Sequence, residues 1–282
     1  MGRRPHRPAV CLGLAAAVTV SLVSGAGAAR ADVEPPDRMA ALGDSITRGF
    51  HACGLLADCT SRSWSTGLDN GVNSHYQRLR TRNPKLTVHN DAATGAKVAA
   101  LKGQAEQAVA QRAQYVTVLI GANDACTRTE AEMTSVADFE TRFRAAMKTL
   151  RAGVPDARIF VASVPDLRRL WAVAKDNVAA RTTWRTFGIC QSMLARPLST
   201  SAADTDRRRR VRQRVIAYNA VLAEVCAENP RCRYDDDAVF SYRFTFNQVS
   251  RWDYFHPNTA GQNVLARVTY ARSFWPATAG VS

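Results

Sequence analysis

The sequence predicts a doubly wound α/β fold with a mostly parallel central sheet, on three observations. Residues 115–120 and 157–164 are apolar runs with the character of strands buried on both faces. Segments with helical spacing of apolar residues alternate with the predicted strands. Each strand ends in a short polar loop, and ligands of such sheets bind at the carboxyl ends of the strands. We therefore expect the functional residues in these loops.

The first half of the chain supplies three predicted strands. Residues 38–42 form the first, and Gly43-Asp44-Ser45 is expected to be a loop that opens a helix. A second strand at 86–90 leads through a turn of small residues to a helix at 98–112. The third strand, 115–120, ends at Gly121-Ala122-Asn123-Asp124.

The second half continues the alternation. We expect a helix at 138–152 with Asp138 as its N-cap, then a strand at 157–164 stopped by Pro165. Residues 166–206 have a weaker pattern and predict a helical insertion held by Cys190, and whether it moves as a lid is left open. A helix from Val211, with Arg207–Arg210 as its solvated start, and a final helix at 259–274 complete the prediction.

The amino-terminal residues have the features of a secretory signal peptide. Arg3, Arg4 and Arg7 precede an apolar run at 8–23 that is too short to span a membrane, and small residues follow up to Ala31. We expect cleavage after Ala31 or at an alanine just upstream, so that residues 1–31 are removed. Residues 32–282 are then expected to form one secreted, extracellular domain.

The cysteines agree with export. Removing Cys11 with the signal leaves six, an even number that suggests three disulfides in an exported chain. Six cysteines allow 15 pairings. The simplest interpretation pairs neighbours in the sequence: Cys53 with Cys59, Cys126 with Cys190 and Cys226 with Cys232. The sequence lacks C-x-x-C and H-E-x-x-H patterns, so we predict neither a metal site nor a cofactor.

The chain is strongly basic, with a formal net charge of +14. Four of these charges lie in the predicted signal, so the remaining domain carries about +10. For an exported protein, the matching partners are anionic membrane surfaces or acidic cell-wall and polysaccharide polymers rather than nucleic acid. The alternative is that most of the arginines are solvated on helix faces. We expect a monomer.

One serine and one histidine are candidates for nucleophilic catalysis. A serine hydroxyl needs a base to remove its proton, and Ser45 follows the first predicted strand. Only His256 has a carboxylate just upstream, Asp253, so that one loop could supply both the base and the group that orients it. We assign no role to the other histidines of the predicted domain, which are His51, His75 and His89.

Taken in order, four short motifs resemble the sequence blocks of the SGNH, or GDSL, hydrolase family. They are Gly43-Asp44-Ser45, Gly95 after Asn90, Gly121-x-Asn123-Asp124 and Asp253-x-x-His256. The resemblance runs from about Met39 to Gly261, and each block lies at a predicted strand end or in a loop. It implies a flavodoxin-like three-layer α/β/α fold and hydrolysis of carboxylic esters.

The resemblance also implies roles for individual residues. Ser45 is expected to be the nucleophile and His256 its base, with Asp253 or a main-chain carbonyl orienting the imidazole. The N–H of Ser45, the main-chain N–H of Gly95 and the side-chain amide of Asn123 are expected to form the oxyanion hole. Asp44 and Asp124 are expected to hold their loops by hydrogen bonds.

The substrate is expected to be an acyl ester of a lipid, with phospholipids and lysophospholipids favoured. The signal, the basic charge, the paired cysteines and an aromatic loop with Phe244, Phe246 and Trp252 resemble secreted actinobacterial lipases and phospholipases of that family. These aromatic residues could instead pack in the core. An esterase that deacetylates cell-wall or plant polysaccharide is the second hypothesis. A secreted protein that binds anionic surfaces without catalysis is the third.

Overall fold

Five parallel strands form the central sheet of the computed structural model, which describes residues 1–2, 33–54 and 56–275. The strands, in chain order, are β1 (Arg38–Gly43), β2 (Thr87–Asn90), β3 (Tyr115–Leu119), β4 (Arg158–Val161) and β5 (Cys232–Tyr234). Their order in the sheet is β2-β1-β3-β4-β5, and every pair is parallel. This is the flavodoxin-like order, and it confirms the predicted fold class.

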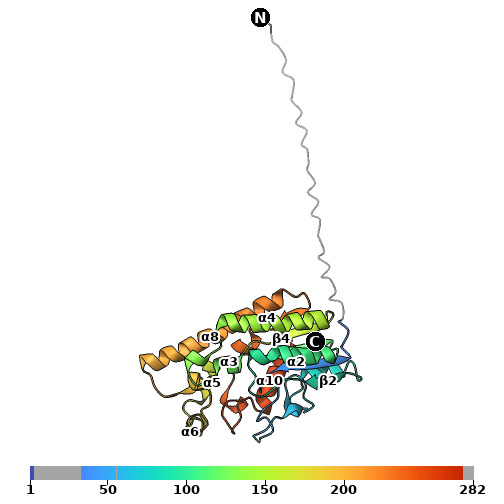
Figure 1. The fold of residues 1–282 in the computed structure, drawn as a ribbon. Helices are drawn as coiled ribbons and strands as arrows, with labels where there is room; N and C mark the ends of the chain where they lie inside the picture. Colours follow the sequence, from blue (N-terminus) through green and yellow to red (C-terminus); the bar gives the residue numbers. More distant parts are fainter. Residues whose placement is uncertain (3–32, 55, 276–282) are drawn as a thin grey trace. The chain divides into compact units, whose positions relative to one another are not determined.

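The helices cover both faces of the sheet (Figure 1). On one face α2 packs against α4, and α4 against α8. On the other face His75 of α1 bonds to Tyr115 of β3 and Thr269 of α10. The helices are α1 (His75–Arg80), α2 (Leu101–Ala110), α3 (Ala122–Ala125), α4 (Val136–Gly153), α5 (Leu167–Ala174), α6 (Val178–Thr186), α7 (Gln191–Leu194), α8 (Ala202–Ala227), α9 (Ala238–Ser241) and α10 (Thr259–Tyr270).

Short 3-10 turns connect some of these elements: η1 (Thr60–Arg62), η2 (Val98–Ala100), η3 (Glu130–Glu132) and η4 (Phe246–Gln248). The predicted helix at 98–112 is thus η2 followed by α2. Contacts group residues 33–282 as one unit. Except for Met1 and Gly2, the predicted signal peptide lies outside the described residues.

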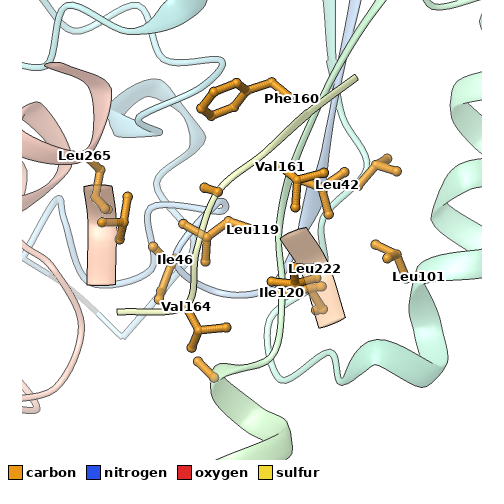
Figure 2. Packing of buried hydrophobic residues seen from close by; sticks show 14 of the residues in the cluster. Leu42, Ile46, Leu101, Leu119, Ile120, Phe160, Val161, Val164, Leu222 and Leu265 are labelled. Carbon is orange, nitrogen blue, oxygen red and sulfur yellow. The ribbon is translucent and has the colours of Figure 1, made fainter. Parts of the chain in front are cut away.

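The hydrophobic core lies on both sides of the sheet. Every residue of β3 is buried, as its continuous apolar run predicts. Figure 2 shows Leu265 of α10 on one side of the strands and Leu101 of α2 on the other. Both are fully packed, with exposures of 0% and 1%. Because the strands are buried on both faces, they are held firmly in place. The loops that follow their carboxyl ends therefore start from fixed positions.

Two of the predicted helix starts were wrong. Ser135, not Asp138, is the N-cap of α4, because its side chain accepts the N–H of Asp138. The second helix begins at Ala202 instead of Val211. Its arginines are a solvated start only in part. Arg209 and Arg210 are exposed as predicted, whereas Arg207 donates to three carbonyls of residues 191–195 and Arg208 is only 3% exposed.

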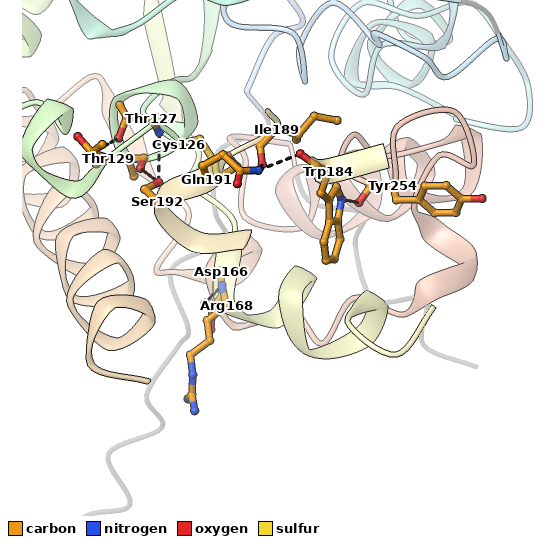
Figure 3. The surroundings of a disulfide bond; sticks show 12 residues. Cys126, Thr127, Thr129, Asp166, Arg168, Trp184, Ile189, Gln191, Ser192 and Tyr254 are labelled. Carbon is orange, nitrogen blue, oxygen red and sulfur yellow. Dashed lines mark hydrogen bonds between the residues drawn. A yellow bond between two sulfur atoms is a disulfide. The ribbon is translucent and has the colours of Figure 1, made fainter. Parts of the chain in front are cut away.

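The insertion at 166–206 is helical, as predicted, and contains α5, α6 and α7. A disulfide from Cys126, after α3, to Cys190, before α7, attaches it to the body of the protein (Figure 3). Ser192 strengthens this attachment, since its hydroxyl donates to the carbonyl of Ala125 at 2.7 Å.

The other two predicted disulfides are also present, Cys53–Cys59 and Cys226–Cys232. Each spans six residues, the first in the loop after β1 and the second between α8 and β5. In the part of the chain that the structure describes, no helix has the length and apolar character required to cross a membrane.

Candidate active site

Ser45 lies in a tight turn directly after β1. Gly43 ends the strand with φ +146°, and a Cβ there would lie 2.3 Å from the carbonyl oxygen of Leu119 on β3. The close approach of two backbones therefore requires glycine. The Oδ1 atom of Asp44 accepts the N–H of Ile46 at 2.9 Å, which fixes the turn around Ser45.

No regular helix opens at Ser45, so that part of the prediction was wrong. The chain makes successive turns, with the N–H of Arg48 bonded to the carbonyl of Asp44 and that of Phe50 to the carbonyl of Ser45. Gly49 then takes φ +63°, and a Cβ there would lie 2.5 Å from the carbonyl oxygen of Cys59. This left-handed position ends helical propagation after about one turn.

His256 comes from the loop before α10, and the backbone of that loop is held by hydrogen bonds. The Oδ1 atom of Asp253 accepts the N–H groups of Phe255 at 3.0 Å and His256 at 3.1 Å. The N–H of Ser250 donates to the carbonyl of His256 at 2.8 Å. Asn258 caps α10 immediately afterwards. The loop thus has one defined conformation at the imidazole.

The structure brings Ser45, His256 and Asp253 together. The Nε2 atom of His256 lies 2.7 Å from the Oγ of Ser45, across 211 positions of sequence. The Nδ1 atom of the same ring contacts the Oδ2 of Asp253. The side chains of His256 and Asp253 are 13% and 9% exposed. A hydroxyl, an imidazole and a carboxylate are therefore arranged in series, partly shielded from solvent.

Asp253 is held in its charged form. Burial alone would raise the pKa of its carboxyl, but hydrogen bonds and charge from His256, with the N–H groups of Phe255 and His256, outweigh it and lower the pKa. A carboxylate in this position accepts from the Nδ1–H of His256 and leaves Nε2 as the basic nitrogen facing Ser45.

Gly95 lies in the loop after β2, and Asn123 lies in the short helix α3 that follows β3, next to the loop of Ser45. Gly95 has φ +82° in a turn closed by the N–H of Ala96 and the carbonyl of Ala93, a position that favours glycine. The Nδ2 of Asn123 donates to the carbonyl of Ala96 at 3.0 Å. The N–H of Ala93 donates to the carbonyl of Gly43 at 3.1 Å. Three strand ends are thus joined at one edge of the sheet.

Asp44 and Asp124 are buried beneath these loops and hydrogen-bond to them, as the sequence predicts. The carboxylate of Asp124 accepts the N–H of Val98 at 2.9 Å and the hydroxyl of Thr134 at 2.7 Å. Burial raises the pKa of Asp44 to about 7, and the charge of Asp124 adds to this, against hydrogen bonding by Ile46 and the charge of His256. Burial also raises the pKa of Asp124.

The other histidines differ in their surroundings. His75 is fully buried, its ring nitrogens bond to Tyr115 and Thr269, and burial lowers its pKa to about 3. His89 is exposed on β2. His51 has its Nε2 atom 3.8 Å from the Oδ2 of Asp253. Sequence analysis assigned no role to His51, and its place beside Asp253 could not be found from spacing, since about two hundred positions separate them.

An apolar pocket opens beside Ser45 and His256. Ile46 lines it next to Ser45, and Phe255 and Pro257 line it on either side of His256. Part of its wall comes from the insertion, through Leu167, Leu170 and Val173. The remaining lining residues are Ala122, Pro165, Asp166, Arg169, Phe244, Gln248 and Val249.

Sequence reasoning missed most of this pocket. The three-residue spacing of Leu167, Leu170 and Val173 was a usable signal for an amphipathic helix, but it could not show that this apolar face lines the pocket. Phe244 lines the pocket and Phe246 packs on the core, whereas Trp252 is exposed.

Among the described residues, no group of three His, Cys, Asp or Glu side chains is placed to hold a metal ion.

Solved structures of hydrolases share this fold at low sequence identity. A variant of Axe2, an acetylxylan esterase from Geobacillus stearothermophilus, is 18% identical with a TM-score of 0.53, covering 86% of this chain and 97% of its own. A protein from Parabacteroides merdae described as GDSL-like lipase is 17% identical with a TM-score of 0.53, covering 83% and 94%. LAE5, an α/β hydrolase from the metagenome of Lake Arreo, is 19% identical with a TM-score of 0.51, covering 84% and 94%. At these identities the likeness establishes the fold alone.

No curated protein matches the chain. The model of the GDSL-like lipase/acylhydrolase family, however, matches residues 41–264. That span begins within β1, contains Ser45, Gly95, Asn123, Asp253 and His256, and ends within α10. The chain therefore belongs to the GDSL-like lipase/acylhydrolase family and is a carboxylic ester hydrolase.

Proposed function

We propose that the protein hydrolyses acyl esters of lipids, phospholipids first among them, with Ser45 as nucleophile, His256 as general base and Asp253 as the group that orients His256. The observation that carries this proposal is the 2.7 Å contact of the Ser45 Oγ with the Nε2 of His256, whose other nitrogen faces Asp253. A serine hydroxyl becomes an effective nucleophile when a positioned base removes its proton.

The reaction has two acyl-transfer steps. As the Ser45 Oγ bonds to the ester carbonyl carbon, its proton moves to the Nε2 of His256, and the carbonyl electron pair moves onto oxygen. The bond to the alcohol then breaks, the alcohol leaves with the proton from Nε2, and the acyl group remains on Ser45. Water attacks the acyl-serine with His256 again taking the proton, and the acid is released as Ser45 regains its hydrogen.

The negative oxygen formed in each step needs hydrogen-bond donors. We propose the main-chain N–H groups of Ser45 and Gly95 and the side-chain amide of Asn123 for this role. A primary amide has two N–H donors, and Asn123 uses one on the carbonyl of Ala96. That bond would aim the second N–H. Because the amide is neutral, its donor strength is independent of pH in the working range.

The pocket supports a lipid acyl chain as the group bound beside Ser45. Most of its lining is aliphatic or aromatic, and removing a methylene from water is worth about 0.8 kcal/mol. An acetyl group has too few carbons to cover an apolar wall made by this many side chains, with Leu170 and Val173 of α5 among them. The apolar surface therefore favours a longer acyl chain over the acetyl ester of a polysaccharide.

A second surface supports contact with an anionic membrane. Val178, Phe187 and Leu198 in the insertion are 67%, 72% and 55% exposed. They accompany Arg181, Arg185 and Arg196, which line a surface groove together with Val178 and Leu198. Exposed apolar side chains among cations match the interface of a bilayer with negative head groups. Val178, Arg181 and Arg185 belong to α6, as does Trp184, which donates a hydrogen bond to the loop of His256. This surface therefore adjoins the proposed site.

We also propose that the protein is secreted after removal of residues 1–31. The three disulfides support an oxidising compartment, because such bonds rarely persist in the cytosol. Intact-mass measurement of the protein from the culture medium would test the cleavage position.

The test of the proposed function compares two substrates. Vesicles of a phosphatidylcholine with different acyl chains at its two positions, and acetylated xylan, are each incubated with the wild type and with Ser45→Ala. We expect fatty-acid release from the phospholipid, detected by mass spectrometry, and its loss in Ser45→Ala. Acetate release from xylan without fatty-acid release would instead assign a polysaccharide deacetylase.

A third outcome would remove the proposal of catalysis. An organophosphonate probe should label Ser45, as identified by peptide mass spectrometry, and His256→Ala should slow the labelling. If Ser45 stays unlabelled and the protein only binds anionic vesicles, then the chain is a surface-binding protein with an inactive site.

A further inference from the structure

We propose that His51 is a positioning residue of the ester hydrolase, holding the carboxylate of Asp253 in place for His256. This inference rests on the proposed function of Ser45, His256 and Asp253. The Oδ2 atom of Asp253 contacts the Nδ1 of His256 and lies 3.8 Å from the Nε2 of His51. One carboxylate oxygen thus faces the rings of two histidines.

Burial strengthens this arrangement. The side chains of His51 and Asp253 are only 2% and 9% exposed. In a site with so little water, an imidazole at this distance interacts with a carboxylate more strongly than it would at the surface. It also occupies space from which water could otherwise hydrogen-bond to Oδ2 and compete with His256.

Phe50 joins the two histidines into one cluster. Its ring centroid lies 4.1 Å from that of His51 and 5.0 Å from that of His256, with edge-on geometry in both pairs. The two imidazole centroids are 5.9 Å apart. Rotation of His51 is therefore limited by a ring that also contacts the proposed base.

The backbone of His51 gives an independent reason to assign it a role. Its φ is +61°, in the left-handed region, which residues other than glycine adopt uncommonly, although histidine, asparagine and aspartate do so more often than the rest. The surrounding loop holds this conformation: the N–H of His51 donates to Ala57 and its carbonyl accepts from Gly54. Strain of this kind persists where the neighbouring structure enforces it, and it gathers at functional sites.

The enforcing contacts come partly from the loop of the proposed base. The hydroxyl of Ser250 donates to the carbonyl of His51 at 3.3 Å, and the N–H of Ser250 donates to the carbonyl of His256. Ser250 thus fixes the backbones of both histidines. On the other side, the N–H of His51 donates to the carbonyl of Ala57, which lies in the loop that the disulfide Cys53–Cys59 closes.

The test removes one nitrogen of the ring. In His51→Asn the amide reaches about as far as Nδ1 and loses the atom that faces Asp253, and asparagine tolerates a positive φ. In His51→Gln the amide reaches about as far as Nε2. We expect kcat on a soluble short-chain p-nitrophenyl ester to fall roughly tenfold or more in His51→Asn, with KM unchanged. We expect His51→Gln to recover most of this loss.

The matched control is His89→Asn, an exposed histidine on β2, which should keep the wild-type kcat. Rates are normalised to the fraction of folded protein measured by far-UV circular dichroism, so that loss of folded protein does not count as loss of turnover. If His51→Asn folds too poorly to assay, His51→Gly, which accepts φ +61° most easily, replaces it with the same expected loss.

A double-mutant cycle tests whether His51 acts through Asp253. In the Asp253→Asn background, His51→Asn should lower kcat no further. A wild-type kcat in His51→Asn, or the same fold-loss with and without Asp253, would overturn the inference. Failure of the proposed function gives a different result, namely wild-type hydrolysis by Ser45→Ala.

Discussion

The indole Nε1 of Trp184 donates to the carbonyl of Tyr254 at 3.1 Å, joining the insertion to the loop of His256 (Figure 3). Trp184 is 1% exposed in α6, and Tyr254 takes φ +55° two residues before His256. The contact ties a helix of the insertion to a loop whose conformation sets the direction of an imidazole.

Trp184→Phe should therefore destabilise the protein and also slow ester hydrolysis. A buried carbonyl left without its donor costs about 1–3 kcal/mol, and a looser loop misaligns His256. Urea unfolding and kcat are the two measurements. Trp171→Phe is the comparison, since it removes an indole bond to Pro197 that does not involve this loop. It should lower stability but not kcat, and equal kcat losses in both variants would contradict the expectation.

Asn123→Ala should lower kcat by about 10²–10³ with a small change in KM, as expected for a donor that acts on the transition state. The change also removes the bond to the carbonyl of Ala96, so thermal unfolding is measured alongside. A kcat within twofold of the wild type, in a folded variant, would exclude Asn123 from the oxyanion hole.

Asp44 should make stability decrease as the pH rises from about 4 to about 7. Burial raises its pKa to about 7, from 3.8. Within this pH window the folded state therefore holds a proton that the unfolded chain has already lost. The contribution of Asp44 to the free energy of unfolding is fully present only below the window. The pKa of Asp253 is lowered, so its effect on stability changes at pH values below this window.

The measurement is urea unfolding of the wild type and Asp44→Asn across that pH range. The asparagine keeps an oxygen for the N–H of Ile46 but has no proton to lose. We expect the variant to gain stability relative to the wild type by at most roughly 4 kcal/mol between the two ends of the window. Parallel pH curves would show that Asp44 titrates alike in both states.

The three disulfides should contribute unequally to stability. On the chain-entropy model, closing the 64-residue separation of Cys126–Cys190 contributes about 4 kcal/mol, against about 2 kcal/mol for the six-residue separation of Cys226–Cys232. Paired serine variants of each bridge, compared by urea unfolding, test this ranking. The reverse order would mean that the long bridge contributes little to the constraint of the unfolded chain.

Leu170→Trp should shift the acyl preference to short chains. Leu170 lines the pocket from α5, and a larger ring there would fill pocket space that a long acyl chain needs and an acetyl group does not. The ratio of kcat/KM for p-nitrophenyl decanoate to that for the acetate should fall at least about tenfold, which corresponds to about two methylenes of lost burial. An unchanged ratio would place the acyl chain outside this pocket.

The sequence predicts the fold class well because buried parallel strands leave a strong local signal. The runs at 115–120 and 157–164 contain β3 and β4, and their apolar character reflects helices on both faces. β5 was missed, since Cys232–Tyr234 is only three residues long and half-buried. Too few residues carry a pattern there, and only pairing with β4 defines the strand.

The site was predicted in part for a similar reason. Ser45, His256 and Asp253 stand in short motifs, so their types and order predict them as a group, and the structure brings them together. His51 has no such motif. Its place depends on a left-handed backbone position and on a hydrogen bond to Ala57 in a loop closed by a disulfide, and neither can be predicted from apolar periodicity. The absence of a helix after Ser45 also depends on a left-handed backbone position, that of Gly49.

All five strands precede residue 235, whereas His256 follows them. A ribosome making this chain therefore completes the whole sheet, and the turn that holds Ser45, before the imidazole partner of Ser45 has been translated. Any product that terminates early lacks that partner, however much of the scaffold it contains. We expect the ability to cleave an ester to be acquired last in synthesis, with the loop that leads into α10.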